Sequence, residues 1–207
     1  MDSNESVDPD ALREDLDRIK DAMGIAERYE SGAEQWLLFG ALVAVGSAVS
    51  QVLVLERAPG FWIPVVWLGL FGAASLGLAR RYDYSYSPGR GDPNAGFQIL
   101  VVYLGSFAAL FAVGPFLSDL GYLAETALDL GVIVVMLGLG YLVAGETLKA
   151  YHIRARDRYA LHAGGVLMVV LGVAIPNVEA LHAWGFTAFG ASYVVYAAAA
   201  YLVLTRT

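Results

Sequence analysis

Long apolar stretches alternate with shorter polar links from residue 35 to the C-terminus of the chain. A helix needs about 20 predominantly apolar residues to cross the hydrocarbon core of a bilayer. Six stretches meet this requirement, at residues 35–55, 61–79, 97–117, 124–144, 159–176 and 180–204. The pattern therefore predicts an all-α, polytopic membrane protein with six transmembrane helices, which the short links on one side arrange as three hairpins.

The Lys and Arg residues are divided unequally between the links, and this predicts the orientation of the chain. Positively charged side chains are retained on the cytoplasmic side of a membrane. On the six-span map, twelve of the thirteen Lys and Arg residues fall on the side that holds both termini, and only Arg57 falls on the other side. We therefore expect a multi-pass protein of the cell membrane with a cytoplasmic N-terminus and a cytoplasmic C-terminus.

The pattern changes in residues 1–34, which we separate as an acidic cytoplasmic tail from the transmembrane domain of residues 35–207. Asp8 followed by Pro9 is typical of a helix start, since Asp caps the first turn and Pro suits the first helical position. Apolar residues then recur at spacings of four and three, at Leu12, Leu16, Ile19, Met23 and Ala26. This narrow apolar stripe predicts an amphipathic helix that packs on another surface.

Acidic side chains on the polar face of this helix would be repelled by anionic lipid headgroups, so a protein surface is the better partner. The link after the fourth predicted span is basic and offers a matching charge. The predicted cytoplasmic interaction surface therefore combines Leu12, Leu16, Ile19 and Met23 with Arg154, Arg156 and Arg158. Its partner is either the chain's own cytoplasmic face, a second copy in a homo-oligomer, or a separate membrane or cytoplasmic protein; the remaining alternative is a disordered tail.

Composition agrees with a membrane protein and excludes several kinds of chemistry. Apolar residues make up 57% of the chain and charged residues 16%, whereas soluble domains contain roughly 25% charged residues. The chain has no cysteine, which excludes disulfides, thiolate metal sites and a cysteine nucleophile. Its net charge of −7 lies entirely in the tail, so no basic stripe favours nucleic acid. No motif indicates a catalytic residue, a cofactor or a metal site.

Polar residues inside a membrane span are costly and are therefore candidates for function. Asp129 is the carboxylate that lies deepest, five residues into the fourth predicted span or about 7.5 Å from its start. Glu125 precedes it by one helical turn, while Gln51 and His182 fall at a comparable depth in other spans. The four residues predict an ion or proton site. The alternative is that both carboxylates stabilise the start of their helix through its dipole.

Small residues also recur at intervals of four, as in Gly69, Ala73 and Gly77 or in Gly105 and Ala109. Such faces let helix backbones approach each other in lipid, so we interpret them as packing faces. The same interval links Gly40 to Ala44 and Gly46 to Ser50.

Only two of the thirteen basic residues are lysine, and the tail is rich in Asp and Glu, which is typical of a halophile. The acidic lead-in continues directly into the segment 36–40 (WLLFG), and the last span contains the segment 185–190 (GFTAFG), followed by Tyr193 and Tyr196. In this layout the chain resembles uncharacterised six-helix integral membrane proteins of halophilic archaea and, more distantly, of bacteria. The resemblance implies the six-helix fold and transfers no activity or catalytic residue.

The charge, the amphipathic stripe and the longer links are all predicted on the cytoplasmic side. We therefore expect a non-enzymatic membrane scaffold or regulatory subunit that works through its cytoplasmic face. The first alternative is a small-solute or ion transporter or channel that uses Asp129. The second alternative is an enzyme that acts on lipid at the inner surface through His152, His162 and Glu146.

Overall fold

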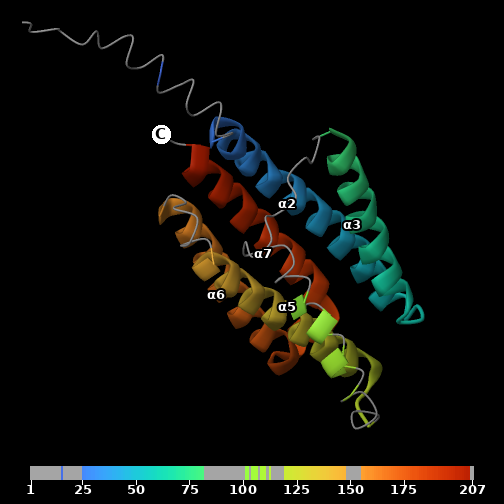
Figure 1. Ribbon diagram of the computed structural model, residues 1–207. Helices are drawn as coiled ribbons and strands as arrows, with labels where there is room; N and C mark the ends of the chain where they lie inside the picture. Colours follow the sequence, from blue (N-terminus) through green and yellow to red (C-terminus); the bar gives the residue numbers. More distant parts are fainter. Residues whose placement is uncertain are drawn as a thin grey trace, which may run out of the picture.

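The computed structural model describes residues 15, 25–81, 101–102, 104–106, 108–110, 112, 119–147 and 155–205. Within this part the chain is all-α (Figure 1). Its delimited helices are α2 (Ile25–Leu55), α3 (Trp62–Arg81), α5 (Tyr122–Thr147), α6 (Ala155–Asn177) and α7 (Glu179–Thr205). The described residues between 101 and 112 are helical as well.

Four of these helices are long and apolar enough to cross a membrane. They are the Trp36–Leu55 part of α2 and the whole of α5, α6 and α7, which confirms the first, fourth, fifth and sixth predicted spans as apolar helices. The second predicted span corresponds to α3, whose apolar part, Trp62–Gly77, is shorter. Much of the third predicted span lies outside the described residues, so the count of six stays a prediction.

Large apolar side chains cover the outside of the helices. Leu68, Val170 and Val195 expose 74%, 63% and 69% of their surface. Soluble monomers rarely expose extensive apolar patches, whereas lipid is the natural neighbour of such a surface. The described helices therefore indicate a multi-pass membrane protein.

The first helix runs through the boundary that the sequence places between tail and transmembrane domain. Because α2 begins at Ile25, the last ten residues of the tail continue directly into the first span as one helix. The predicted amphipathic stripe from Leu12 to Met23 lies outside the described residues, and Asp15 is the described residue there, in helical conformation.

The end of α2 is fixed by a Schellman motif. Arg57 has a φ of 51°, in the left-handed region that favours glycine. The N–H of Arg57 donates to the carbonyl of Val54 at 3.1 Å, and the N–H of Ala58 donates to that of Leu53 at 2.9 Å. These bonds satisfy two carbonyl groups at the helix end and turn the chain towards α3.

The closest helix contacts are between α5 and α6, where glycines face each other in two antiparallel pairs. A Cβ atom built on Gly138 would lie 2.6 Å from the carbonyl oxygen of Gly165, and one on Gly172 would lie 2.7 Å from that of Gly131. Real Cβ atoms essentially never approach so closely, so the two backbones touch only because these residues lack side chains. The glycines are seven residues apart on each helix, which is the repeat of helices that coil around each other.

The pair α2 and α7 has the same seven-residue repeat. A Cβ on Gly40 would lie 2.9 Å from the Cβ of Ala197, and one on Gly190 would lie 2.7 Å from the Cβ of Ser47. The two pairs are joined where Gly164 of α6 leaves space for the ring of Tyr196, because a Cβ on this glycine would overlap that ring. Four helices thus form one bundle.

Two of the predicted four-residue packing faces differ in their contacts. The face at Gly46 and Ser50 of α2 contacts α3, whereas the face at Gly69 and Gly77 of α3 contacts no other described helix. Gly46 lies under the ring of Trp67, whose Nε1–H donates to Ser50 Oγ at 3.1 Å and so joins α3 to α2. Apart from the chain neighbours and the backbone of α3 itself, no described atom lies within 4 Å of the Cβ position of Gly69 or Gly77. The seven-residue repeat therefore sets the close contacts within the α5–α6 and α2–α7 pairs, whereas the four-residue face at Gly46 and Ser50 receives α3.

Replacing Gly138 by Ala is expected to lower the free energy of unfolding by about 1–3 kcal/mol, because the added methyl group forces two backbones apart. Gly69→Ala is the matched control, since it adds the same methyl group to a helix position with open space, and should leave stability unchanged or slightly raised. Thermal unfolding of the purified proteins in detergent measures both. Equal effects of the two substitutions would contradict the packing described here.

Candidate functional site

The described bundle has two opposite ends, and each helix begins near one end and finishes near the other (Figure 1). At one end α2 and α6 begin while α3, α5 and α7 finish. We call this the arginine-rich end, because five of the six described Lys and Arg residues belong to it. They are Arg28, Arg80, Arg81, Arg156 and Arg158. The other end, which we call the Asp129 end, holds Arg57 and the four residues of the predicted ion or proton site.

The two carboxylates of the predicted site lie one turn apart in the first turns of α5. Glu125 is exposed and Asp129 is half-buried. Glu125 lies in the first turn, where the positive end of the helix dipole favours a carboxylate, and Asp129 lies one turn further in. Their proximity also means that two like charges repel when both are ionised. This arrangement suits either helix stabilisation or the binding of one cation or proton.

Gln51 is buried, and its amide group is used to join α2 to α7. Its Nε2–H donates to the carbonyl of Ala183 at 2.6 Å, while its Oε1 accepts from the N–H of Thr187 at 3.0 Å and from the hydroxyl of Thr187 at 3.1 Å. Ala183 and Thr187 are four residues apart, so Gln51 bonds the two backbone groups that pair with each other in a regular helix. The side chain acts as a polar link between two spans.

His182 is half-buried near the start of α7. Its Nε2 lies 2.9 Å from the carbonyl oxygen of Pro176. Because a carbonyl oxygen only accepts hydrogen bonds, this nitrogen carries a hydrogen and donates it. Pro176 lies inside the last turn of α6, so His182 ties the start of α7 to the end of the preceding helix.

The four residues of the predicted site therefore share one end of the bundle, but two of them are engaged with backbone groups. Across the described ranges, no group of three or more His, Asp or Glu side chains could hold a metal ion. What remains of the predicted ion or proton site is the carboxylate pair of Glu125 and Asp129. Its role stays a prediction.

At the arginine-rich end, the structure brings together His162 and Glu146. The sequence offers these two residues only for the alternative in which the protein is an enzyme that acts on lipid. Nε2 of His162 on α6 lies 2.9 Å from Oε1 of Glu146 on α5, and Nδ1 lies 2.6 Å from the carbonyl oxygen of Arg158. The third residue of that alternative, His152, lies outside the described residues. The sequence contains no spacing motif for this pair, because the two residues meet only when α5 and α6 pack in register.

The predicted cytoplasmic interaction surface is described only in part. Arg156 is exposed and Arg158 is half-buried in the first turn of α6. Nε of Arg158 is buried without a hydrogen-bond partner among the described residues. Arg154, Leu12, Leu16, Ile19 and Met23 lie outside the described ranges, so the docking of the tail on this end stays a prediction.

An aromatic cluster in the half of the bundle nearest the arginine-rich end joins four helices. Trp36 of α2 packs edge-on against Tyr196 of α7 with ring centroids 5.3 Å apart. The hydroxyl of Tyr196 donates to the carbonyl of Ala160 on α6 at 2.9 Å, and the hydroxyl groups of Tyr141 on α5 and Tyr193 on α7 are hydrogen-bonded to each other. The tyrosine hydroxyls thus serve helix packing.

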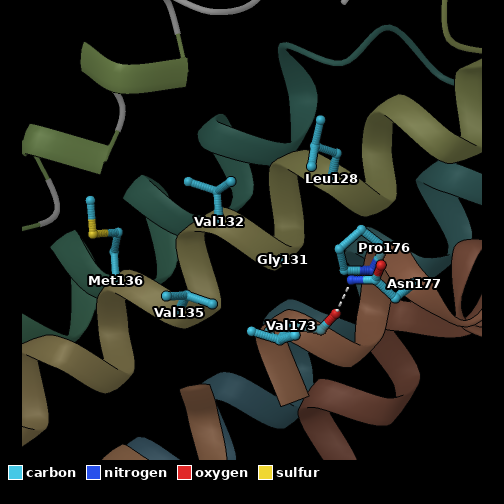
Figure 2. Close-up of a pocket in the computed structure, with 9 residues that line it drawn as sticks. Leu128, Gly131, Val132, Val135, Met136, Val173, Pro176 and Asn177 are labelled. Atoms are coloured by element: carbon cyan, nitrogen blue, oxygen red, sulfur yellow. Dashed lines mark hydrogen bonds between the residues drawn. The ribbon is translucent and has the colours of Figure 1, made fainter. Parts of the chain in front are cut away.

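A groove with a volume of about 270 Å³ lies between α5 and α6, and Figure 2 shows the residues that line it. Apolar side chains and glycines line it, together with one amide. The lining residues are Leu128, Gly131, Val132, Val135, Met136, Gly172, Val173, Pro176 and Asn177. The amide of Asn177 donates to the carbonyl of Val173 at 2.7 Å, so its polar group is used within α6. No titratable side chain lines this groove, which therefore offers surface for apolar groups and no acid–base chemistry.

Comparison of the chain with models of protein families, with curated proteins and with solved structures gives no match. The interpretation of these residues therefore rests on their geometry, and the resemblance to six-helix proteins of halophilic archaea stays a prediction.

Replacing Gln51 by Leu is expected to lower the free energy of unfolding by about 1–2 kcal/mol, because it removes the polar link between α2 and α7. Thr187→Val removes only the hydroxyl donor and should cost less, about 0.6 kcal/mol. Unfolding of the detergent-solubilised variants measures the difference. If Gln51→Leu left stability unchanged but abolished cation binding, Gln51 would be a ligand rather than a structural link.

Proposed function

We propose that this chain is a non-enzymatic scaffold or regulatory subunit of the cell membrane, and that it works through its arginine-rich end. The main support is that polar side chains inside the bundle form hydrogen bonds with neighbouring helices. Gln51, Tyr193 and Tyr196 bond to neighbouring helices, and the groove between α5 and α6 is apolar. Polar side chains that serve packing suit a structural role better than transport or catalysis.

The proposal includes six spans with both termini in the cytoplasm. The uneven distribution of basic residues supports this orientation, because five of the six described Lys and Arg residues belong to one end of the bundle. On this orientation the acidic tail, the link of residues 148–154 and the C-terminus share the cytoplasmic side. A partner would therefore meet the arginine-rich end. This partner is a second copy or another membrane or cytoplasmic protein, unless the tail itself covers that end.

Single cysteines test this orientation directly, because the natural chain contains none. A membrane-impermeant maleimide applied to intact cells is expected to label a cysteine placed at Glu56 or Glu179, and to label one placed at Arg156 only after permeabilisation. Gel-shift analysis of the labelled protein measures both. Labelling of the cysteine at Arg156 from outside would invert the orientation and remove the basis for a cytoplasmic working face.

The alternative function is transport of an ion or small solute through Asp129. It is supported by one observation, the half-buried position of this carboxylate beside Glu125 within a candidate span. Carboxylates at such depth are costly and often belong to ion pathways. The two proposals predict different effects on cation flux when the negative charge of Asp129 is removed.

On the scaffold proposal, Asp129→Asn is expected to leave cation flux and growth at high salt unchanged and to alter only protein abundance or assembly. Flux is measured with Na⁺-sensitive and pH-sensitive dyes in proteoliposomes that contain the purified protein. Glu125→Gln is the matched control, since it removes the neighbouring charge at the more exposed position. A loss of flux in Asp129→Asn alone would favour the transporter and overturn the scaffold proposal.

A further inference from the structure

The contact between Glu146 and His162 is a polar contact at the ends of two membrane helices. Glu146 lies in the last turn of α5, and His162 lies two turns into α6. The imidazole ring rests against Gly145, where a Cβ atom would lie 2.8 Å from the ring carbon Cε1. Glycine at this position therefore lets the ring reach across to α5.

Both nitrogens of the His162 ring face hydrogen-bond acceptors. Nδ1 lies 2.6 Å from the carbonyl oxygen of Arg158, and Nε2 lies 2.9 Å from a carboxylate oxygen of Glu146. A carbonyl oxygen and an ionised carboxylate can only accept. The Nδ1 bond requires a hydrogen on Nδ1, and the Nε2 bond requires a second proton between Nε2 and Glu146. A neutral imidazole carries only one hydrogen on its two nitrogens, so it cannot make both bonds with an ionised Glu146.

We propose that Glu146 and His162 form a proton-binding site, in which one proton held between Nε2 and Oε1 closes a clasp between α5 and α6. An imidazole is a stronger base than a carboxylate, so the proton resides on His162 and the closed clasp is an imidazolium–carboxylate pair. This proposal does not depend on the proposed function or on the orientation of the chain.

Both side chains of the site are partly exposed at the ends of their helices. The side chain of His162 is 32% exposed and that of Glu146 is 55% exposed. The other charged groups in the first turns of α6 are Arg156, Asp157 and Arg158. From α7, the nearby titratable group is Tyr196, whose hydroxyl is already bonded to the carbonyl of Ala160.

The contact between Glu146 and His162 is expected to weaken as the pH rises, because the imidazole ring then loses one of its two hydrogen-bond donors. When the shared proton is lost as the pH rises, the Nδ1–H still bonds to the carbonyl of Arg158, and the lone pair of Nε2 then faces the carboxylate. The two acceptors repel each other and the clasp opens. The glycine contacts at Gly138 and Gly172 do not involve ionisable groups, so the response is confined to the ends of α5 and α6.

Nitrogen-15 NMR of the full-length protein, labelled at its three histidines and reconstituted in phospholipid nanodiscs, tests the protonation state. The signals of His162 are assigned by their loss in His162→Gln. We expect two protonated ring nitrogens at the acidic end of a pH series and one at its alkaline end. A His162 ring with one protonated nitrogen throughout the series would overturn the proposal.

The variant Glu146→Gln tests the clasp independently. A glutamine amide can accept from a protonated ring and donate to a neutral one, so this variant keeps the contact in both states of the ring. The melting temperature of the wild type is expected to fall relative to that of Glu146→Gln by roughly 2–4 °C from the acidic to the alkaline end of the pH series. Identical pH profiles of the two proteins would also overturn the proposal.

Discussion

The structure depends on the direct approach of helix backbones in two antiparallel pairs. In lipid the hydrophobic effect does not drive apolar helices together, so packing contacts and hydrogen bonds between helices must hold them. Glycines at 131, 138, 165 and 172 allow such contacts between α5 and α6, and small residues at 40, 47, 190 and 197 allow them between α2 and α7. The rest of the described bundle is arranged around these two pairs.

Closely packed helices leave little space for water, and this determines how the polar residues are used. Gln51 bonds to the backbone of α7, Tyr196 to that of α6, and His182 to the carbonyl of Pro176. A polar group that finds a partner on a neighbouring helix avoids the cost of an unpaired group in an apolar medium. Gln51 and His182, two of the residues that the sequence offers as candidates for chemistry, form such links between helices.

The apolar stretches could be predicted from sequence because hydropathy and length act locally, and four of the six are confirmed as long apolar helices. The contacts between helices could not, since they depend on which faces meet. Gly138 and Gly165 are no different in sequence from Gly69 and Gly77, yet only the first two are in contact. The same holds for Glu146 and His162, which are 16 residues apart and share no motif. The sequence identifies Gln51 as a polar residue at depth, but its partners on α7 lie more than 130 positions away.

The glycine repeat does not by itself define a single alignment of α5 and α6. If the two helices slid past each other by seven residues, or about 10 Å, Gly138 would face Gly172 and Gly145 would face Gly165. That arrangement has as many glycine pairs as the native one. It would, however, separate Glu146 from His162 and remove the imidazole ring from Gly145. The contact between Glu146 and His162 thus favours one of two alignments that have equal numbers of glycine pairs, much as one buried polar residue selects the register of a coiled coil.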